Sequence, residues 1–369
     1  MACAALRVSS HRNRNGCNNY NGSMAVTAHN SPIADVLVIG AGPTGLACAI
    51  DAQNLGCRVM LVDKGCLTNS LFHYPAHMTF FTTPELLEIG NMPFSSPNQK
   101  PTRAEALEYY RKVAEHYKLD VRQYQNVDKV TGSDGAFAVH TTDQFGRKLQ
   151  HRARKLIVST GYYDLPNYLN IPGEELPKVK HYYHEPHPYF AQDVLVIGGK
   201  NSAAIAALDL WRHGARVTLA HRGEALHRHI KYWIKPDIEN RIKNGEITAY
   251  LNTVVTRIDE DTVTLATAPM KNGQPAMFET VNERTIPNQF VFALTGYHPD
   301  FSFIESLGIH LDAGNARCPV CNRATLESNV PGIYLAGVIV AGERTNEIFI
   351  ENGRFHGALI ARDLATKLK

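Results

Sequence analysis

Two glycine-rich turns, each directly after a short apolar run, carry the residues most suited to chemistry in this sequence. The first turn is Gly40-Ala41-Gly42-Pro43-Thr44-Gly45, and the second is Gly198-Gly199-Lys200-Asn201-Ser202-Ala203. A strand that turns into a helix through such residues presents backbone N–H groups and the positive end of the helix to a phosphate. Two such turns in one chain predict a protein that holds two dinucleotides and passes electrons between them.

The first turn stands in the context that this pattern needs. Gly40 allows the tight turn, Gly42 lets a pyrophosphate approach the backbone, and Gly45 lets the helix pack closely on the strand. Asp63 follows the next strand and would accept hydrogen bonds from a ribose hydroxyl. A solvated strand end is the alternative interpretation of this carboxylate.

The second turn departs from the pattern. Lys200 stands where the middle glycine is expected, and Ala203 takes the place of the third. His221-Arg222 follows the second strand, where an acid is usual. A carboxylate there would repel a 2′-phosphate, whereas a guanidinium binds one in a bidentate manner. NADPH is therefore favoured over NADH, with a surface arginine as the alternative. The predicted NADPH-binding residues are Gly198, Gly199, Lys200, Asn201, Ser202, Ala203, His221, Arg222 and Gly296, with Lys231 and Lys235 as further cations.

A segment near the C-terminus resembles the second FAD contact of flavoproteins that bind two dinucleotides. It runs from Tyr334 to Val338 and continues in Asn346–Gly353. Val338 replaces the usual aspartate, so its contact with FAD would be through the backbone, and a helix beginning near Asn352 would face the flavin with its N-terminus. The residues predicted to bind FAD are Gly40, Gly42, Pro43, Thr44, Gly45, Asp63, Lys64, Gly161, Gly337, Val338, Ile348 and Phe349.

Each glycine turn opens a unit with the same order of elements: strand, helix, strand, meander and closing apolar strand. The first unit has a strand at Asp35–Ile39 and a helix from about Thr44 to Leu55. The second has a strand at Asp193–Ile197 and a helix at Ser202–His213. The order predicts an α/β fold of the thioredoxin-reductase-like type, with two Rossmann-like domains that bind FAD and NADPH.

The predicted domain boundaries follow from this duplication. Residues 34–165 and 299–369 form a discontinuous FAD-binding domain, and residues 166–298 form the NADPH-binding domain. The connections Gly161–Glu174 and Gly296–Asp300 are predicted hinges. Within the first domain, Thr102-Arg103-Ala104-Glu105 is a capping box. The helix that it opens is predicted to place Leu107, Tyr110, Val113, Ala114 and Tyr117 on one face.

Composition and charge narrow the class of protein. A net charge of +3 in 369 residues gives no argument for nucleic acid, and no apolar stretch is long enough to span a membrane. Seven scattered cysteines suit reduced thiols in the cytoplasm better than a secreted disulfide framework. Residues 1–33 are polar and predicted to be a disordered extension, with Met24 as an alternative start.

Neither the cysteines nor the histidines form a metal-binding pattern, and no metal is predicted. Cys318-Pro319-Val320-Cys321 has the spacing of a metal or redox pair but lacks a second pair for zinc, so a structural role is favoured. Cys48 is expected in the core, and Cys66 near the adenosine end of the first site. His181, His184 and His187 are expected to pack near a domain junction.

Four stretches of the sequence resemble one family of flavoproteins over about Ala34 to the C-terminus. They are Phe80–Gly90 (FFTTPELLEIG), Lys100–Arg111 (KPTRAEALEYYR), Gly198–Ala203 (GGKNSA) and Asn346–Gly357 (NEIFIENGRFHG). They are similar to the YpdA-type flavoproteins, the bacillithiol-disulfide reductases. This resemblance implies an FAD enzyme that uses NADPH to reduce the disulfide of a low-molecular-weight thiol.

One position departs from that family. Its members commonly carry an attacking cysteine in the first turn, where this sequence has Thr44, whose ordinary role is to cap the helix. Either another thiol such as Cys48 or Cys66 takes part, or no protein thiol does, or the acceptor differs. The open alternatives are electron transfer to a small redox protein, as in ferredoxin- or flavodoxin-NADP reductases, and a non-catalytic flavoprotein that senses NADPH. A homo-oligomer is compatible with each.

Overall fold

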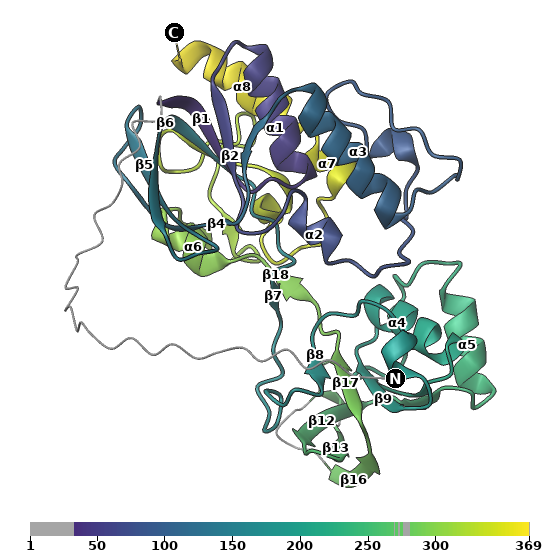
Figure 1. Cartoon of the computed structure of the whole chain (residues 1–369). Helices are drawn as coiled ribbons and strands as arrows, with labels where there is room; N and C mark the ends of the chain where they lie inside the picture. The colour runs from purple at the N-terminus through teal and green to yellow at the C-terminus, as the bar shows by residue number, and fades with distance from the viewer. Residues whose placement is uncertain (1–32, 269, 272–273, 276–280, 369) are drawn as a thin grey trace, which may run out of the picture.

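The structure is a computed structural model of the chain, and it describes residues 33–268, 270–271, 274–275 and 281–368. The predicted extension therefore lies outside the described residues except for Ile33. The structure has two largely parallel sheets, and each glycine turn directly follows a strand of one of them. Helices pack against both sheets (Figure 1). The α/β class and the predicted order of elements are confirmed.

The first sheet has seven strands in the order β3-β2-β1-β6-β5-β4, with β21 paired to β6. β1 lies between β2 and β6 in parallel, and its apolar side chains are buried, as a central parallel strand requires. β4, β5 and β6 form an antiparallel meander. The strands are β1 (Ala34–Ile39), β2 (Val59–Val62), β3 (Asp120–Arg122), β4 (Gln125–Thr131), β5 (Phe137–Asp143), β6 (Lys148–Val158) and β21 (Ile333–Leu335).

Helices cover this sheet. α1 (Pro43–Asn54) starts at the first glycine turn and packs against α8 (His356–Lys367). α3 (Arg103–His116) begins at the predicted capping box: the Thr102 hydroxyl accepts the N–H of Glu105 at 3.3 Å, and the Glu105 carboxylate accepts the N–H of Thr102 at 2.8 Å. Shorter helical segments are α2 (Asn69–Phe72), η1 (Pro84–Leu86), α6 (Phe301–Ser306), η3 (Gly337–Ala341) and α7 (Ile350–Gly353).

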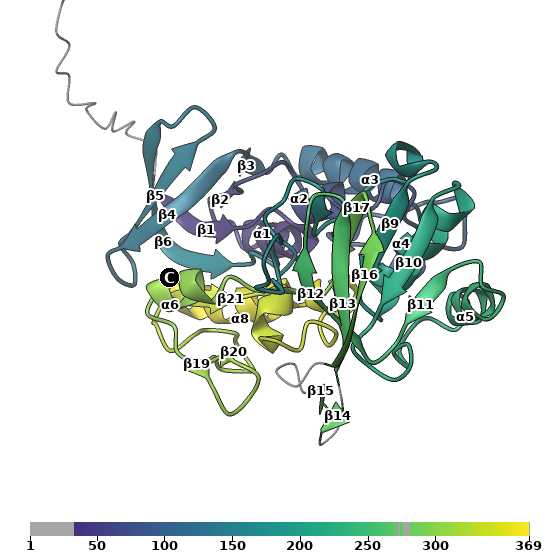
Figure 2. The same ribbon diagram turned by 90° about the horizontal axis from the view of Figure 1, so that it is seen from below.

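The second sheet has five parallel strands in the order β11-β10-β9-β17-β8. Figure 2 shows β12, β13 and β16 running side by side as a smaller sheet. The elements are β8 (Val179–Lys180), η2 (His187–Tyr189), β9 (Asp193–Ile197), α4 (Asn201–Arg212), β10 (Arg216–Ala220), α5 (Lys235–Lys243), β11 (Thr248–Tyr250), β12 (Thr253–Ile258), β13 (Thr262–Thr267), β14 (Met270–Lys271), β15 (Gln274–Pro275), β16 (Val281–Pro287) and β17 (Phe290–Ala293).

The chain crosses between the two sheets twice, at β7 (Leu165–Pro166) and β18 (Tyr297–His298). These two short strands pair with each other in antiparallel fashion, and Figure 1 places them between the two halves of the molecule. The domain boundaries predicted at 165/166 and 298/299 fall on this pair. Both predicted hinge segments contain one of its strands, while the hinge motion itself stays a prediction.

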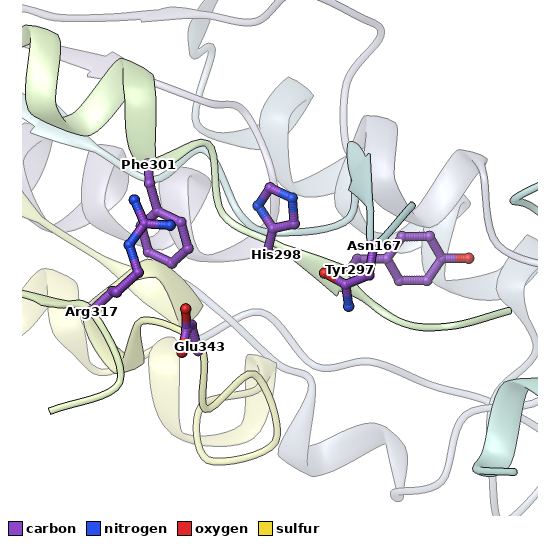
Figure 3. Close-up of a pocket in the computed structure, with 6 residues that line it drawn as sticks. All are labelled: Asn167, Tyr297, His298, Phe301, Arg317 and Glu343. Carbon is purple, nitrogen blue, oxygen red and sulfur yellow. The ribbon is translucent and has the colours of Figure 1, made fainter. Parts of the chain in front are cut away.

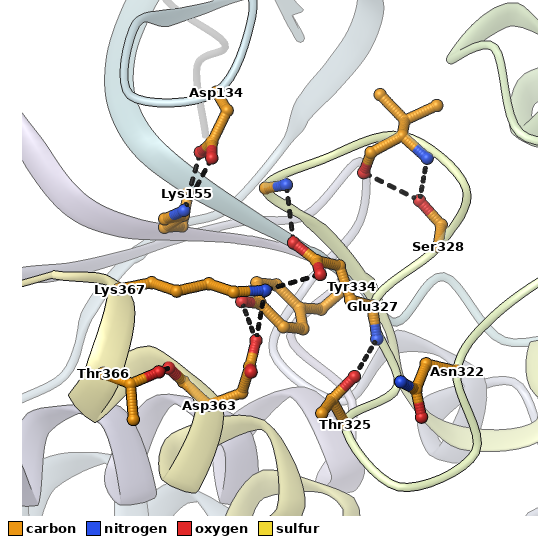
Figure 4. Close-up of polar contacts among 12 residues, drawn as sticks. Asp134, Lys155, Asn322, Thr325, Glu327, Ser328, Tyr334, Asp363, Thr366 and Lys367 are labelled. Atoms are coloured by element: carbon orange, nitrogen blue, oxygen red, sulfur yellow. Dashed lines mark hydrogen bonds and ion pairs between the residues drawn. The ribbon is translucent and has the colours of Figure 1, made fainter.

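The C-terminal segment returns to the first sheet and is fixed there by polar contacts (Figure 4). The Lys367 ammonium lies 2.5 Å from the Glu327 carboxylate and 2.7 Å from that of Asp363. The Tyr334 hydroxyl of β21 donates to Asp363 at 2.6 Å. Because β21 pairs with β6, residues near position 335 and near position 160 belong to one sheet. The predicted discontinuous first domain requires this arrangement. Two further strands, β19 (Leu311–Asp312) and β20 (Cys318–Pro319), form a small hairpin in this segment.

The predicted face of α3 packs against the core, and the structure adds Tyr109 to the buried side chains of this helix. Its buried residues include Tyr110 and Val113, as expected, but also Tyr109, whereas Leu107 is only half buried. Tyr109 stacks on Phe94 with ring centroids 4.4 Å apart, and its hydroxyl donates to the carbonyl of Met92 at 2.8 Å. The irregular segment before the helix therefore covers a side that helical periodicity alone left exposed. Ala114 and Tyr117, also predicted, are half buried as well.

The single helix predicted to begin near Asn352 was also wrong. The structure has the four-residue α7, an interruption at Arg354–Phe355, and then α8. The Asn352 side chain accepts the N–H of Phe349 at 2.8 Å and donates to the carbonyl of Glu347 at 2.9 Å, so it fixes the preceding loop. A helix of one turn supplies little of the dipole on which the predicted flavin contact was based.

Candidate functional site

A cavity of about 1350 Å³ lies between the two sheets and receives both glycine turns. The predicted residues that line it are Gly40, Gly42, Pro43, Thr44, Asp63, Lys64, Gly161, Gly337, Val338, Ile348, Phe349, Gly198, Gly199, Lys200, Asn201, Ser202, His221, Arg222 and Gly296. Gly45 and Ala203 are buried beneath the turns and do not line it. The structure thus brings together side chains from positions 40 to 349 in one space.

The first turn has the shape that a pyrophosphate needs. Gly40 has a φ of +104°, and a Cβ there would lie 2.5 Å from the carbonyl oxygen of Ser159. A Cβ on Gly45 would lie 2.0 Å from the carbonyl oxygen of Gly40, so helix and strand are in closest contact at this point. A Cβ on Gly42 would meet nothing within 4 Å, and Gly42 lines the cavity. Two glycines therefore serve the fold, and the third leaves room for a ligand.

Asp63 shapes this turn. Its carboxylate accepts the backbone N–H of Ala41 at 2.7 Å and that of Gly65 at 2.8 Å. Burial raises the pKa of Asp63, and these two hydrogen bonds oppose that rise. A carboxylate has about four acceptor positions, so it can also accept from a ribose hydroxyl, and this contact stays a prediction. The neighbouring Lys64 forms an ion pair with Asp164 at 3.0 Å.

The capping role expected for Thr44 was wrong. The N-cap residue of α1 is Gly42, and no side chain caps this helix end. The Thr44 hydroxyl instead faces the C-terminal segment, where it would lie 3.0 Å from a Cβ on Gly353 and 3.4 Å from one on Gly337. Thr44 therefore marks where the first turn meets the predicted second contact with FAD.

The C-terminal part of that contact is set by a residue that the sequence analysis did not single out. The backbone N–H of Gly337 donates to His356 Nδ1 at 3.0 Å. This bond requires an unprotonated Nδ1, and burial lowers the pKa of His356, which favours the neutral ring. Gly337, with a φ of +77°, and Val338 present their backbone at the cavity, as the missing aspartate predicts.

The second turn is covered by a loop. A Cβ on Gly199 would lie 2.4 Å from the ring of His221, so the imidazole packs directly on the glycine. The N–H of His227 donates to the carbonyl of Gly199 at 2.9 Å, and Asn201 Oδ1 accepts the N–H of Lys231 at 3.0 Å. These contacts place the basic segment after β10 against the turn that is predicted to bind NADPH.

Cations gather at this second turn. Arg222 and Lys231 line the cavity beside Lys200, whose side chain is exposed. Burial lowers the pKa of His221, and the nearby Arg222 lowers it further, so this ring is neutral at physiological pH. Arg222 and the lysines are left as the permanent charges for a phosphate. Lys235, the other predicted cation, begins α5 and pairs with Glu239 at 3.8 Å.

None of the five cysteines among the described residues lines the cavity. Cys48 is buried in α1, as expected, and burial raises the pKa of its thiol. The Cys66 Sγ lies 3.6 Å from Asn69 Oδ1, and its pKa is raised by burial and by Asp63. Both weak candidates for a redox thiol are therefore disfavoured as thiolates. Cys318 and Cys321 are free thiols, and Cys318 is buried.

Four tyrosines that the sequence analysis overlooked line the cavity near the β7–β18 pair: Tyr74, Tyr162, Tyr163 and Tyr297. The rings of Tyr163 and Tyr297 are 4.4 Å apart, and Tyr297 stacks on Tyr182 at 5.2 Å. A sequence signal existed, because both units close with Thr-Gly-Tyr, at Thr160–Tyr162 and Thr295–Tyr297. Aromatic rings thus pack where the chain crosses between the sheets.

Of the three histidines expected at the junction, His181 and His184 lie near it. The carbonyl of His184 accepts the N–H of Ala76 from the first unit at 2.8 Å. His181 Nε2 lies 3.7 Å from the Glu174 carboxylate, and His187 begins η2. Within the described ranges, no group of three or more potential metal ligands is arranged as a metal site.

The sequence profile of the pyridine nucleotide-disulphide oxidoreductases matches residues 37–337. The chain belongs to this family. It is 44% identical over 332 residues to bacilliredoxin reductase Bdr of Bacillus subtilis (strain 168), an alignment that covers 90% of this chain and 97% of that protein. The predicted family is thereby confirmed.

Solved structures agree. Bacillithiol disulfide reductase Bdr (YpdA) from Bacillus cereus is 45% identical, with a TM-score of 0.84 over 90% of this chain and 99% of that one. The thioredoxin reductase of T. acidophilum, at 20% identity and a TM-score of 0.68 over 92% and 99% of the two chains, has the same fold. The protein is an oxidoreductase whose cofactors are FAD and NADPH. In the described part of the chain, no helix has the length and apolar character to cross a bilayer.

Proposed function

We propose that this protein reduces the disulfide of a low-molecular-weight thiol of the bacillithiol type with electrons from NADPH. The observation that carries the proposal is the 45% identity, at a TM-score of 0.84, to a structure named bacillithiol disulfide reductase. The cavity supports it, because it joins both glycine turns in one space. The net reaction converts one disulfide, NADPH and a proton into two thiols and NADP⁺.

The residues present fit both cofactors. For FAD, the binding residues would be those of the first turn with Asp63, Lys64, Gly161, and the backbone of Gly337 and Val338, while Ile348 and Phe349 would contact the ring system. Gly42 supports this assignment, because its missing side chain leaves open space on the side of the turn that lines the cavity. When bound, FAD supplies the transfer of two electrons from NADPH to the acceptor.

The NADPH assignment rests on the second turn. Gly198 to Ser202 and Gly296 would contact the nucleotide, Ala203 would support the turn from below, and His221 would hold Gly199 in place. Arg222 would bind the 2′-phosphate. Charge-assisted hydrogen bonds contribute about 1.5–3 kcal/mol, so Arg222→Ala should raise the KM for NADPH by about 10- to 100-fold and leave that for NADH nearly unchanged. An equal rise for both nucleotides would count against the assignment.

We infer that none of the cysteines in the described part of the chain takes part in the reaction. Thr44 stands at the family's cysteine position, and the described cysteines lie outside the cavity. Cys66→Ser and Cys48→Ala should therefore keep the rate of the parent enzyme. A loss of turnover in either variant, with flavin content unchanged, would restore that cysteine as a redox group.

The decisive assay is NADPH oxidation by the purified holoenzyme with bacillithiol disulfide, followed together with the appearance of thiols. We expect two thiols per NADPH consumed and a rate well above that with oxygen alone. No stimulation by the disulfide would refute the proposed substrate. Rapid reduction of ferredoxin, flavodoxin or another small redox protein in its place would assign the alternative acceptor, and flavin reduction without turnover would assign a sensor.

Two further properties belong to this proposal. The described cysteines are free, which fits a reducing compartment, so we place the reaction in the cytoplasm. We also propose a homo-oligomer, because Leu86 and Phe355 are exposed large apolar side chains, and Arg354 bonds to the carbonyls of Glu85 and Glu88, which brings their segments together. Light scattering that gives the mass of one chain would exclude the oligomer.

A further inference from the structure

A second, smaller pocket of about 390 Å³ adjoins the cavity near the β7–β18 pair (Figure 3). Its lining residues are Asn167, Tyr297, His298, Phe301, Arg317 and Glu343. Four of these, Asn167, Tyr297, His298 and Glu343, also line the large cavity. The pocket is therefore a side chamber of the space that is proposed to hold the cofactors, and it has its own charged groups.

Arg317 forms one wall of this pocket. Its guanidinium lies over the ring of Phe301, 4.0 Å from the ring centroid, and Phe301 itself is buried. In the described part of the chain, no carboxylate lies within ion-pair distance of Arg317. A planar cation fixed on an aromatic face, without a protein anion beside it, is suited to bind a carboxylate of a ligand.

The backbone fixes Arg317 relative to Glu343. Ala316 and Arg317 have φ values of +50° and +49°, a conformation that costs about 1–3 kcal/mol for each non-glycine residue. The carbonyl of Ala316 accepts the N–H of Glu343 at 2.8 Å. A Cβ on Gly342 would lie 2.3 Å from that carbonyl oxygen, so the two segments are in direct contact. Backbone strain of this kind persists where the surrounding structure enforces it. Here the contact between the two segments fixes the backbone of Arg317 relative to that of Glu343.

Glu343 and His298 complete the polar wall. The Glu343 carboxylate is exposed and forms no ion pair with a cation of the described residues, although Arg317 lines the same pocket (Figure 3). His298 Nδ1 donates to the carbonyl of Pro299 at 2.8 Å, so Nε2 is the ring nitrogen left to contact a ligand. The pocket thus offers a guanidinium on one side and a carboxylate with an imidazole nitrogen on the other.

We propose that this pocket binds the charged groups of one half of the disulfide substrate, with Arg317 on a carboxylate and Glu343 on an ammonium group. The inference rests on the proposed function and adds the recognition of its substrate. A thiol of the bacillithiol type carries the free ammonium group of its cysteine residue close to the sulfur, and its carboxylates lie on its malate residue. The pocket then selects disulfides of this class by charge, while its junction with the large cavity leaves the sulfur atoms on the side of the cofactors.

The test uses holoenzyme variants and four disulfides of different charge. Arg317→Met and Glu343→Gln are compared with Arg362→Met and Glu305→Gln, which remove the same charges from exposed positions outside both cavities. The ligands are bacillithiol disulfide, 3,3′-dithiodipropionate (carboxylates only), cystamine (ammonium groups only) and bis(2-hydroxyethyl) disulfide (uncharged). Binding to the oxidised enzyme without NADPH is measured by calorimetry, and turnover is measured separately.

Arg317→Met should raise the Kd and KM for bacillithiol disulfide and 3,3′-dithiodipropionate by at least about tenfold. Glu343→Gln should weaken binding of cystamine and bacillithiol disulfide but strengthen binding of 3,3′-dithiodipropionate, because a repulsive charge is removed. A general distortion of the site would not give these opposite signs. The control variants and the uncharged disulfide should show changes within about twofold.

The two proposals fail in distinguishable ways. If the parent enzyme reduces no disulfide, the proposed function is wrong, and the calorimetry still reports on the pocket. If the parent enzyme reduces bacillithiol disulfide but Arg317→Met and Glu343→Gln leave its Kd unchanged, or weaken all four ligands equally, the pocket does not recognise the substrate. Absence of any binding of bacillithiol disulfide to the oxidised parent enzyme overturns the pocket proposal as well.

Discussion

Gly42 and Gly45 lie three residues apart in one turn and have opposite relations to their surroundings. A Cβ on Gly45 would overlap the carbonyl of Gly40 at 2.0 Å, so Gly45→Ala should destabilise the flavin-free protein by about 1–3 kcal/mol. A Cβ on Gly42 would stand in open space at the cavity, so Gly42→Ala should leave that stability unchanged and weaken flavin binding by at least about tenfold.

Two measurements separate these effects. Thermal unfolding of the flavin-stripped proteins reports on the fold, and the flavin absorbance per protein after dialysis reports on binding. The two variants serve as controls for each other, because they add the same methyl group to the same turn. If Gly42→Ala unfolds as readily as Gly45→Ala, or retains flavin as the parent protein does, the role given to Gly42 is wrong.

Local sequence pattern predicted what depends on neighbours in the chain. The glycine turns, the buried runs of β1 and β9 and the capping box of α3 are each determined within about ten residues, and they stand where expected. The contact of Thr44 with Gly337 and Gly353 joins residues about 300 positions apart, which no local pattern contains. The small pocket beside Arg317 was not predicted for the same reason. Its lining residues come from the β7–β18 region, from the start of α6 and from two separate C-terminal loops.

At the scale of elements, the contact between α1 and α8 includes the carboxylate of Asp51, whose charged form is disfavoured by burial. Asp51 lies on α1 against Gly357 of α8, where a Cβ would stand 2.3 Å from Asp51 Oδ2. Burial raises the pKa of Asp51 to about 6. The folded state therefore binds a proton that the unfolded state has released between about pH 4 and pH 6, and stability falls as the pH rises through this range.

Asp51→Asn should remove that loss. We expect the variant to be more stable than the parent by about 1 kcal/mol at pH 7.5, a value reduced for the partial exposure of the group, and by much less at pH 4. Urea unfolding at both pH values measures this, with the exposed Glu115→Gln of α3 as the control. A gain of the same size at both pH values would mean that charge is not its cause.

A contact between the two units depends on the loop that covers the second glycine turn. The Lys100 ammonium lies 3.4 Å from the centroid of the Trp233 ring, and the rings of Phe81 and Trp233 are 6.0 Å apart. Asn201 ties this loop to the turn through Lys231. Rotation of one unit about the β7–β18 pair, as the hinge prediction requires, would separate Trp233 from Lys100 and Phe81.

Fluorescence can follow this contact because the chain has only two tryptophans, Trp211 and Trp233. In Trp211→Phe, the remaining emission comes from Trp233, and we expect a red shift when NADP⁺ is added, since the ring becomes more exposed to water. Trp211→Phe with Lys100→Ala should start from a more exposed ring and show a smaller shift. Emission that stays fixed at saturating NADP⁺ would speak against rotation of the units on nucleotide binding.

At the scale of the whole molecule, the two units differ in how their cores are assembled. The two buried clusters of the second unit consist of residues between Val179 and Leu294. The core of the first unit combines residues from Ala34 to Val158 with residues from Phe301 to Leu364. The second unit therefore encloses its core within one stretch of chain, whereas the first needs both of its segments.

This difference predicts the behaviour of fragments. Residues 166–298 alone should fold cooperatively and bind NADP⁺, because all strands of the parallel sheet β11-β10-β9-β17-β8 lie within them. Residues 34–165 alone should not fold, because they lack β21 beside β6 and the helix α8 that packs on α1.

A protein in which a short glycine-rich linker replaces the second unit and joins 34–165 to 299–368 should recover folding and flavin binding. The linker can be short, because β7 and β18 pair with each other and residues 165 and 299 are therefore close together. Circular dichroism during thermal unfolding and calorimetry with each nucleotide test these three proteins. A fragment 166–298 that stays unfolded, or a joined first unit that binds no flavin, would show that the domain boundaries are misplaced or that each unit needs the other to fold.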